Sequence, residues 1–197
     1  IKTASNFWTV SIGRPADYNL PEYWYLPTAK GGKRDMVRAL SENAFPKGFY
    51  EEVQENATGQ LNEIDFDGDY LSIDENIARM SAYTIRQYQP SFLALHLVAV
   101  DHFEHEQGRD GEKVRSAVAG ADRAVKTIME AVAKAGLSDN TTIIVVGDHG
   151  FVNIHATISP NTLLAKAGLY NPNDKANWKA YFHAAGGATF LQLRDKN

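Results

Sequence analysis

Two aspartates, each paired with a nearby histidine, follow the two most apolar runs of this sequence. Asp101 ends the first run and is followed four residues later by His105, and Asp148 ends the second run and is followed directly by His149. Carboxylate oxygens and imidazole nitrogens are ligands that suit Zn²⁺ or Mn²⁺. The two pairs therefore predict a hydrolytic metal centre.

The elements around these pairs predict how they would meet. The apolar runs 92–100 and 142–147 have the composition of buried strands, and 111–135 between them has a helical period with Gly136 as its stop. In such a β-α-β unit both pairs lie at the carboxyl edge of one parallel sheet. If the strands are neighbours, Asp101 and Asp148 lie roughly 5–10 Å apart. That spacing suits two ions about 3.5–4 Å apart, as used in phosphoryl displacement.

Other interpretations of these residues remain open. The stretch after Asp101 is also compatible with a solvated polar loop, which contains weaker ligand candidates: His102, Glu104 and Glu106. Alternation along the strand places His96 on the face opposite Asp101, which favours a core or helix-packing role for it. An N-cap role for Asp148 is disfavoured because no clear helix follows.

The remaining pattern alternates between helices and strands. Strands are predicted at 3–12, 181–184 and 189–193, and helices at 33–45, 48–56, 72–89 and 161–168. Ser72 and Glu75 have capping-box spacing at the start of the helix 72–89. No linker separates a second domain. The prediction is an α/β fold with an open, mostly parallel sheet and helices on both faces.

Composition limits the function classes. The 197 residues are 44% hydrophobic and 22% charged, which is ordinary for a globular protein with one sizeable core. A formal charge of −4 gives no signature of nucleic-acid or anionic-membrane binding. No apolar run approaches the length of about 20 residues that spans a bilayer, and no signal peptide is expected at the start. Because cysteine is absent, any metal must use N and O ligands, and the compartment stays undetermined.

The metal motifs carry a resemblance to a known family. Asp101-x-x-x-His105 and the stretch 140–150, Asn-Thr-Thr-Ile-Ile-Val-Val-Gly-Asp-His-Gly, closely resemble the alkaline phosphatase superfamily, nearest to its type I phosphodiesterase/nucleotide pyrophosphatase branch. The stretches 2–8 and 19–24 also resemble the middle of such a catalytic domain. The resemblance implies a two-zinc site that hydrolyses phosphate esters or nucleotide-like substrates through a covalent phospho-Thr or phospho-Ser enzyme. It also implies a periplasmic or extracellular location.

By position in the motifs, the resemblance implies that Asp101 and His105 hold one zinc and that Asp148 and His149 hold the other. The family's Asp-Gly-x-Arg segment and its Thr or Ser nucleophile do not occur here, and no His-Gly pair follows His149. We therefore expect residues 1–197 to be a partial catalytic domain that lacks the N-terminal nucleophile region and a C-terminal metal-ligand region. The isolated 197 residues are then expected to be inactive.

Several weaker candidates complete the sequence picture. His155 and His183 lack the context of the missing ligand, and Thr28 lacks an adjacent base or helix cap. The segment 65–69 resembles a calcium loop but has its glycine at the fourth position instead of the sixth. The segment 30–34 lacks P-loop spacing. The alternatives to the phosphodiesterase are a sulfatase or phosphomutase of the same superfamily, or a catalytically inert α/β module.

Overall fold

The structure is a computed structural model, which describes residues 1–22, 35–66, 71–174 and 176–194. The chain divides into two compact units, Ile1–Val152 and Asn153–Asn197. The four predicted metal ligands all belong to the first unit. Thr28 and the segment 30–34 lie outside the described residues, as does most of the segment 65–69.

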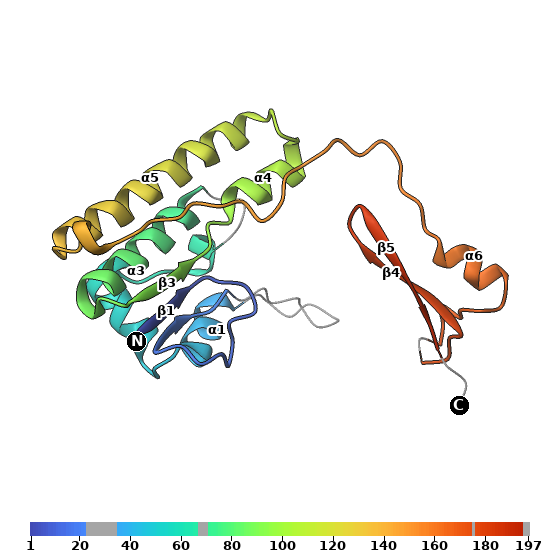
Figure 1. Cartoon of the computed structure of the whole chain (residues 1–197), viewed down its shortest axis with the longest axis horizontal. Helices are drawn as coiled ribbons and strands as arrows, with labels where there is room; N and C mark the ends of the chain where they lie inside the picture. Colours follow the sequence, from blue (N-terminus) through green and yellow to red (C-terminus); the bar gives the residue numbers. More distant parts are fainter. Residues whose placement is uncertain (23–34, 67–70, 175, 195–197) are drawn as a thin grey trace. The chain divides into compact units, whose positions relative to one another are not determined.

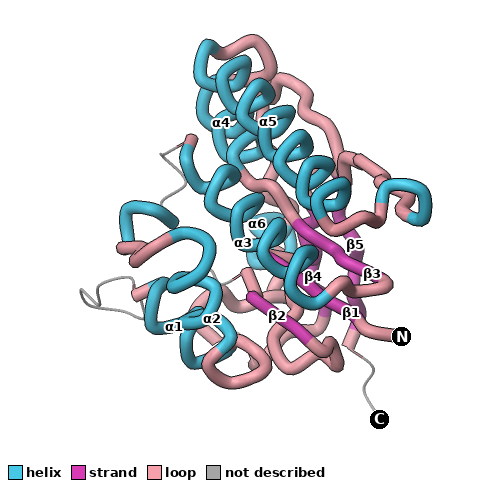
Figure 2. Tube along the Cα trace, turned by 90° about the vertical axis from the view of Figure 1, so that its left-hand side faces the viewer, coloured by secondary structure: helices cyan, strands magenta, loops and turns pink. Residues whose placement is uncertain are grey.

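The first unit contains a three-stranded parallel sheet in the order β2-β1-β3. Its strands are β1 (Thr3–Asn6), β2 (Tyr18–Leu20) and β3 (Phe92–Leu95), with β1 paired to both neighbours (Figure 2). The parallel sheet packed against helices confirms the predicted α/β class. The strand predicted over 3–12 is shorter, because Phe7 and Val10 have φ of 55° and 53°, which a strand does not tolerate. The strand β2 was not predicted.

The four helices predicted in this unit are present as α1 (Met36–Asn43), α2 (Phe49–Val53) with the π-helical η1 (Gln54–Thr58), α3 (Ser72–Tyr88) and α5 (Glu112–Lys134). The helix α4 (Ala99–Gln107) and the 3₁₀ turns η2 (Glu63–Phe66) and η3 (Ser138–Asn140) were not predicted. The predicted capping box does not form, because the N-cap of α3 is Leu71 and makes no side-chain cap. None of the helices in the described ranges is long and apolar enough to cross a membrane.

Helix α3 is the centre of the core and packs on two sides. One side contributes Ile77 and Met80, both fully buried, to a cluster that also holds Phe7, Leu20, Leu40 and Tyr50. The other side packs against α5, and the two helices run side by side in Figures 1 and 2. Each such large apolar side chain stabilises the fold by about 1.5–3 kcal/mol. The sheet is tied to α3 by Asn6, whose amide donates to Ser81 Oγ at 3.0 Å and to Thr84 Oγ1 at 3.3 Å.

The strand predicted at 142–147 is absent, and that prediction is wrong. The segment has no strand hydrogen bonds, and its side chains are exposed: 77% for Ile144, 71% for Val145 and 75% for Val146. Within the described residues, β3 pairs only with β1. A segment rich in β-branched residues forms a strand only when a neighbouring strand pairs with it and one of its faces packs against the core. Among the described residues, the segment 142–147 has neither a pairing strand nor a packed face.

The run 92–100 is also not one strand. Strand β3 ends at Leu95 and α4 begins at Ala99, so Asp101 lies in the first turn of a helix instead of at a strand end. The cause is Asp74 of α3, which is 1% exposed and accepts hydrogen bonds from the backbone N–H of Val98 at 2.8 Å and of Ala99 at 3.3 Å. These are donors that a helix start leaves without a partner. A distant carboxylate therefore starts α4.

The second unit contains α6 (Asn161–Lys166) and an antiparallel hairpin of β4 (Ala180–Ala185) and β5 (Ala188–Leu193). Both strands and the helix were predicted. Gly186 has φ of 62° at the turn, where a side chain would be strained. The Asn161 side chain joins helix to hairpin, since its Oδ1 accepts from Phe182 N and its Nδ2 donates to Phe182 O, both at 2.8 Å.

Replacing Asp74 by alanine should leave two buried N–H groups at the start of α4 without a hydrogen-bond acceptor. We expect a loss of about 1–3 kcal/mol in the free energy of unfolding, measured by urea denaturation. Asp74→Asn keeps an acceptor oxygen and should lose less. Glu75→Ala is the matched control. Among the described residues Glu75 forms an ion pair with Arg79 at the exposed surface, so its loss should change stability by no more than about 0.5 kcal/mol. Equal stability of Asp74→Ala and wild type would contradict this cap.

Candidate metal centre

The first predicted pair lies on one face of α4. Asp101 and His105 are one helical turn apart, and His105 Nε2 is 3.6 Å from Asp101 Oδ2. The side chains are 46% and 68% exposed, so both are open to a ligand. The helix start set by Asp74 fixes this arrangement, because spacing of four residues faces the same way only once α4 has formed. The expected proximity of Asp101 and His105 thus arises from a helix turn.

The second predicted pair reaches the first. His149 Nε2 is 3.5 Å from Asp101 Oδ1 and 3.6 Å from Asp148 Oδ2. Asp101 therefore lies between two imidazoles, with one carboxylate oxygen toward each. The structure brings the four predicted residues together even though the strand expected to carry Asp148 is absent.

Phe151 holds the two histidines from one side. Its ring packs edge-on against His105 at 4.7 Å between centroids and against His149 at 5.3 Å. His149 Nδ1 lies 3.3 Å from Gly150 O, which leaves Nε2 toward the two carboxylates. Sequence reasoning missed Phe151, although an aromatic residue directly after an Asp-His-Gly stretch is a visible signal.

The distances between these donors test whether they fit a metal. At 3.5–3.6 Å the N···O separations exceed the 2.7–3.2 Å of a good hydrogen bond. Two ligands of one tetrahedral zinc, with bonds of about 2.0–2.2 Å, lie about 3.3–3.6 Å apart. The donor type and spacing therefore fit Zn²⁺. In the part of the chain that the structure describes, no group of three His, Cys, Asp or Glu side chains could hold an ion, so the donors form pairs and not a closed site.

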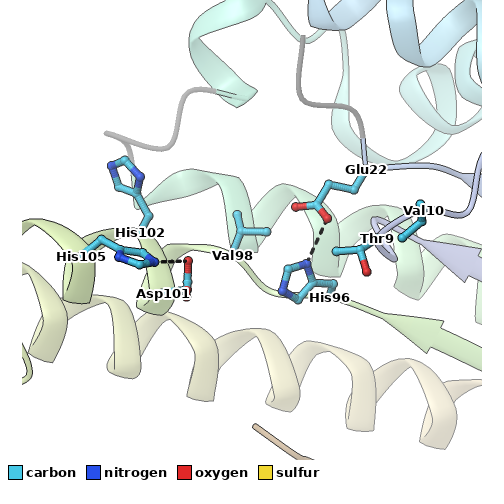
Figure 3. Close-up of a pocket in the computed structure, with 8 residues that line it drawn as sticks. All are labelled: Thr9, Val10, Glu22, His96, Val98, Asp101, His102 and His105. Carbon is cyan, nitrogen blue, oxygen red and sulfur yellow. Dashed lines mark ion pairs between the residues drawn. The ribbon is translucent and has the colours of Figure 1, made fainter. Parts of the chain in front are cut away.

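A cavity of about 330 Å³ lies beside Asp101 and His105 (Figure 3). Its wall includes His96, Glu22 and Thr9, which come from three different segments. The prediction that His96 points away from Asp101 is wrong. Strand alternation stops at Leu95, so it does not set the direction of His96.

His96 forms an ion pair with a buried carboxylate. Glu22 Oε2 lies 3.4 Å from His96 Nδ1, and the Glu22 side chain is only 4% exposed. The Glu22 carboxylate raises the pKa of His96 above its usual value, opposed by partial burial and supported by the charges of Asp148 and Asp74. Sequence reasoning missed Glu22, because no local pattern links it to a histidine so far along the chain.

The weaker ligand candidates lie in different parts of the structure. His102 also lines the cavity, and its Nε2 is 3.5 Å from Glu106 on the next turn of α4. Glu104 lies on the same helix and is partly buried. His155 and His183 belong to the second unit. The weaker standing of these five residues as ligands stays a prediction.

The Glu22–His96 pair should stabilise the fold in a pH-dependent way. Because the pKa of His96 is raised, its contribution is complete below the unfolded value of about 6.5 and is lost as pH rises through the folded value. We expect a coupling free energy of about 1 kcal/mol at pH 5.5, falling toward zero by pH 9.

The measurement is a double-mutant cycle of Glu22→Gln and His96→Gln by urea unfolding, with a chelator present. A parallel cycle on the exposed pair Arg38 and Glu42, which is 2.7 Å apart, is the control and should show no such pH dependence. A coupling that is constant from pH 5.5 to pH 9 would show that His96 is not charged by Glu22.

Comparison with known proteins agrees with the motifs. The chain matches the type I phosphodiesterase/nucleotide pyrophosphatase family over residues 1–196. Comparisons with curated proteins and with solved structures gave no match. The family match spans both Asp/His pairs and the segments that form the cavity beside them. This chain is a member of the type I phosphodiesterase/nucleotide pyrophosphatase family, which is a family of hydrolases.

Proposed function

We propose that this chain carries part of the catalytic centre of a zinc-dependent phosphoric ester hydrolase, of the phosphodiesterase or nucleotide pyrophosphatase type. The observation that supports it most is the spacing of 3.5–3.6 Å between carboxylate and imidazole donors from two separate segments. The family match supports the hydrolase class and phosphoester substrates.

In this proposal Asp101 and His105 hold one zinc, and Asp148 and His149 hold the other. Bound zinc would act as a Lewis acid on the phosphoryl oxygens and lower the pKa of a coordinated hydroxyl or water. The two carboxylates would balance part of the ions' charge, and Asp101, which lies between both histidines, links the two pairs.

The other residues keep these donors in place. Asp74 fixes the first turn of α4, and Phe151 restricts both imidazole rings. Because two ligands do not complete a zinc shell, we propose that the remaining ligands and the Thr or Ser nucleophile come from outside these 197 residues. The isolated 197 residues would then bind zinc weakly and not turn over substrate.

Removal of either carboxylate tests the metal assignment. We expect Asp101→Ala and Asp148→Ala each to weaken zinc binding by at least about 100-fold. Loss of a residue that only hydrogen-bonds to a metal ligand costs about 10- to 100-fold, and loss of the ligand itself should cost at least as much. Zinc content after equilibrium dialysis is the direct readout. Hydrolysis of bis(p-nitrophenyl) phosphate by the full-length protein should be lost in both variants.

Asp139→Ala is the matched control, because Asp139 is an exposed carboxylate in the turn η3 and belongs to neither pair. It should retain zinc and activity. Full activity of Asp101→Ala and Asp148→Ala in the full-length protein would contradict the proposal. Absence of zinc from the full-length wild type would favour the inert α/β module.

A further inference from the structure

We infer that His96 is a substrate-contacting residue, positioned by Glu22, which donates a hydrogen bond from Nε2 to an oxygen of the bound phosphoric ester. This inference deepens the proposed function and rests on it. The family match assigns no role to either residue, and neither belongs to the two Asp/His pairs.

The backbone of His96 is held firmly at the cavity wall. Its N–H donates to Asn6 O at 3.2 Å, which continues the pairing of β3 with β1 by one residue. Asn6 is itself fully buried and anchored to α3 through Ser81 and Thr84. The imidazole therefore projects from a fixed point of the sheet into the cavity that Asp101 and His105 also line (Figure 3).

The two ring nitrogens of His96 have different surroundings. Nδ1 faces the buried Glu22 carboxylate at 3.4 Å. Nε2 makes no hydrogen bond or ion pair with any residue in the described ranges, and the side chain is 31% exposed. At 3.4 Å the contact between Nδ1 and the carboxylate is an ion pair and not a hydrogen bond, and it leaves Nε2 as the ring nitrogen available to a ligand.

The charge of the pair favours a phosphoric ester as the ligand. The Glu22 carboxylate beside Nδ1 raises the pKa of His96, which favours the protonated imidazole. Both nitrogens then carry hydrogen, and Nε2–H is a charge-assisted donor. Phosphoryl oxygens accept such bonds, and the pair, being neutral overall, adds no net repulsion to an anionic substrate. The cavity of about 330 Å³ is of the size that small-molecule sites have.

If the Glu22–His96 pair only stabilised the fold, its removal would leave substrate affinity unchanged. A change in substrate affinity therefore tests the inference. In the full-length, zinc-loaded protein, His96→Gln keeps a donor near the position of Nε2. The double variant His96→Phe with Glu22→Gln removes the donor and leaves no buried, charged carboxylate beside the new phenyl ring. We expect kcat/KM for bis(p-nitrophenyl) phosphate to fall about 10- to 100-fold in the double variant, mainly through KM, and to be largely retained in His96→Gln. Zinc content should not change in either.

A binding measurement separates this inference from the proposed function. The Cε1–H resonance of His96, assigned by its loss in His96→Gln, should shift when inorganic phosphate is added to the zinc-loaded protein. If wild type hydrolyses the diester but the double variant keeps its KM and the resonance does not move, the His96 contact is wrong and the proposed function stands. If wild type does not hydrolyse it but phosphate moves the resonance, the proposed function fails and the contact stands. If neither occurs, both are wrong.

Discussion

The buried carboxylate of Asp74 is the constraint on which the candidate site depends. It reaches from the first turn of α3 to the N–H groups of Val98 and Ala99 and so sets where α4 begins. Without that start, Asp101 and His105 would not lie one turn apart on a common face. Burial raises the pKa of Asp74, while the two N–H donors act to lower it. The same contact fixes the short connection from His96 to α4 and thereby shapes the cavity wall.

In the candidate site, imidazole and carboxylate groups face one another at distances that are too long for good hydrogen bonds. Imidazole and carboxylate atoms at 3.5–3.6 Å gain little as hydrogen bonds, and most of these side chains are substantially exposed. Such a group is poorly explained as a stabilising ion-pair network. Under the proposed function, co-ligation of a divalent ion would account for both the spacing and the mixture of groups.

Across the cavity, the Glu22–His96 pair differs from the donors around Asp101 in its burial. Glu22 is almost fully enclosed, so its charge acts on His96 with little screening by solvent. Asp101, His105 and His149 are all more exposed than Glu22 and are open to ligands. Under the two proposals, Asp101 and His105 on one side of the pocket would bind a metal, and His96 on the other side would donate to the substrate.

Local pattern was sufficient for the long helices α3 and α5, for the hairpin of β4 and β5, and for the residue types of the metal motif. Periodicity and turn chemistry act over a few residues, and the sequence contains them in full. The start of α4, the direction of His96 and the partner of Glu22 depended on contacts between segments far apart in the chain. The segment 142–147 also shows why local pattern was insufficient. Its residues favour a strand, but a strand forms only beside a neighbouring strand. The α/β class and the candidate residues Asp101, His105, Asp148 and His149 can be read from the sequence. How these residues come together depends on the folded chain, because hydrogen bonds between distant segments set the start of α4.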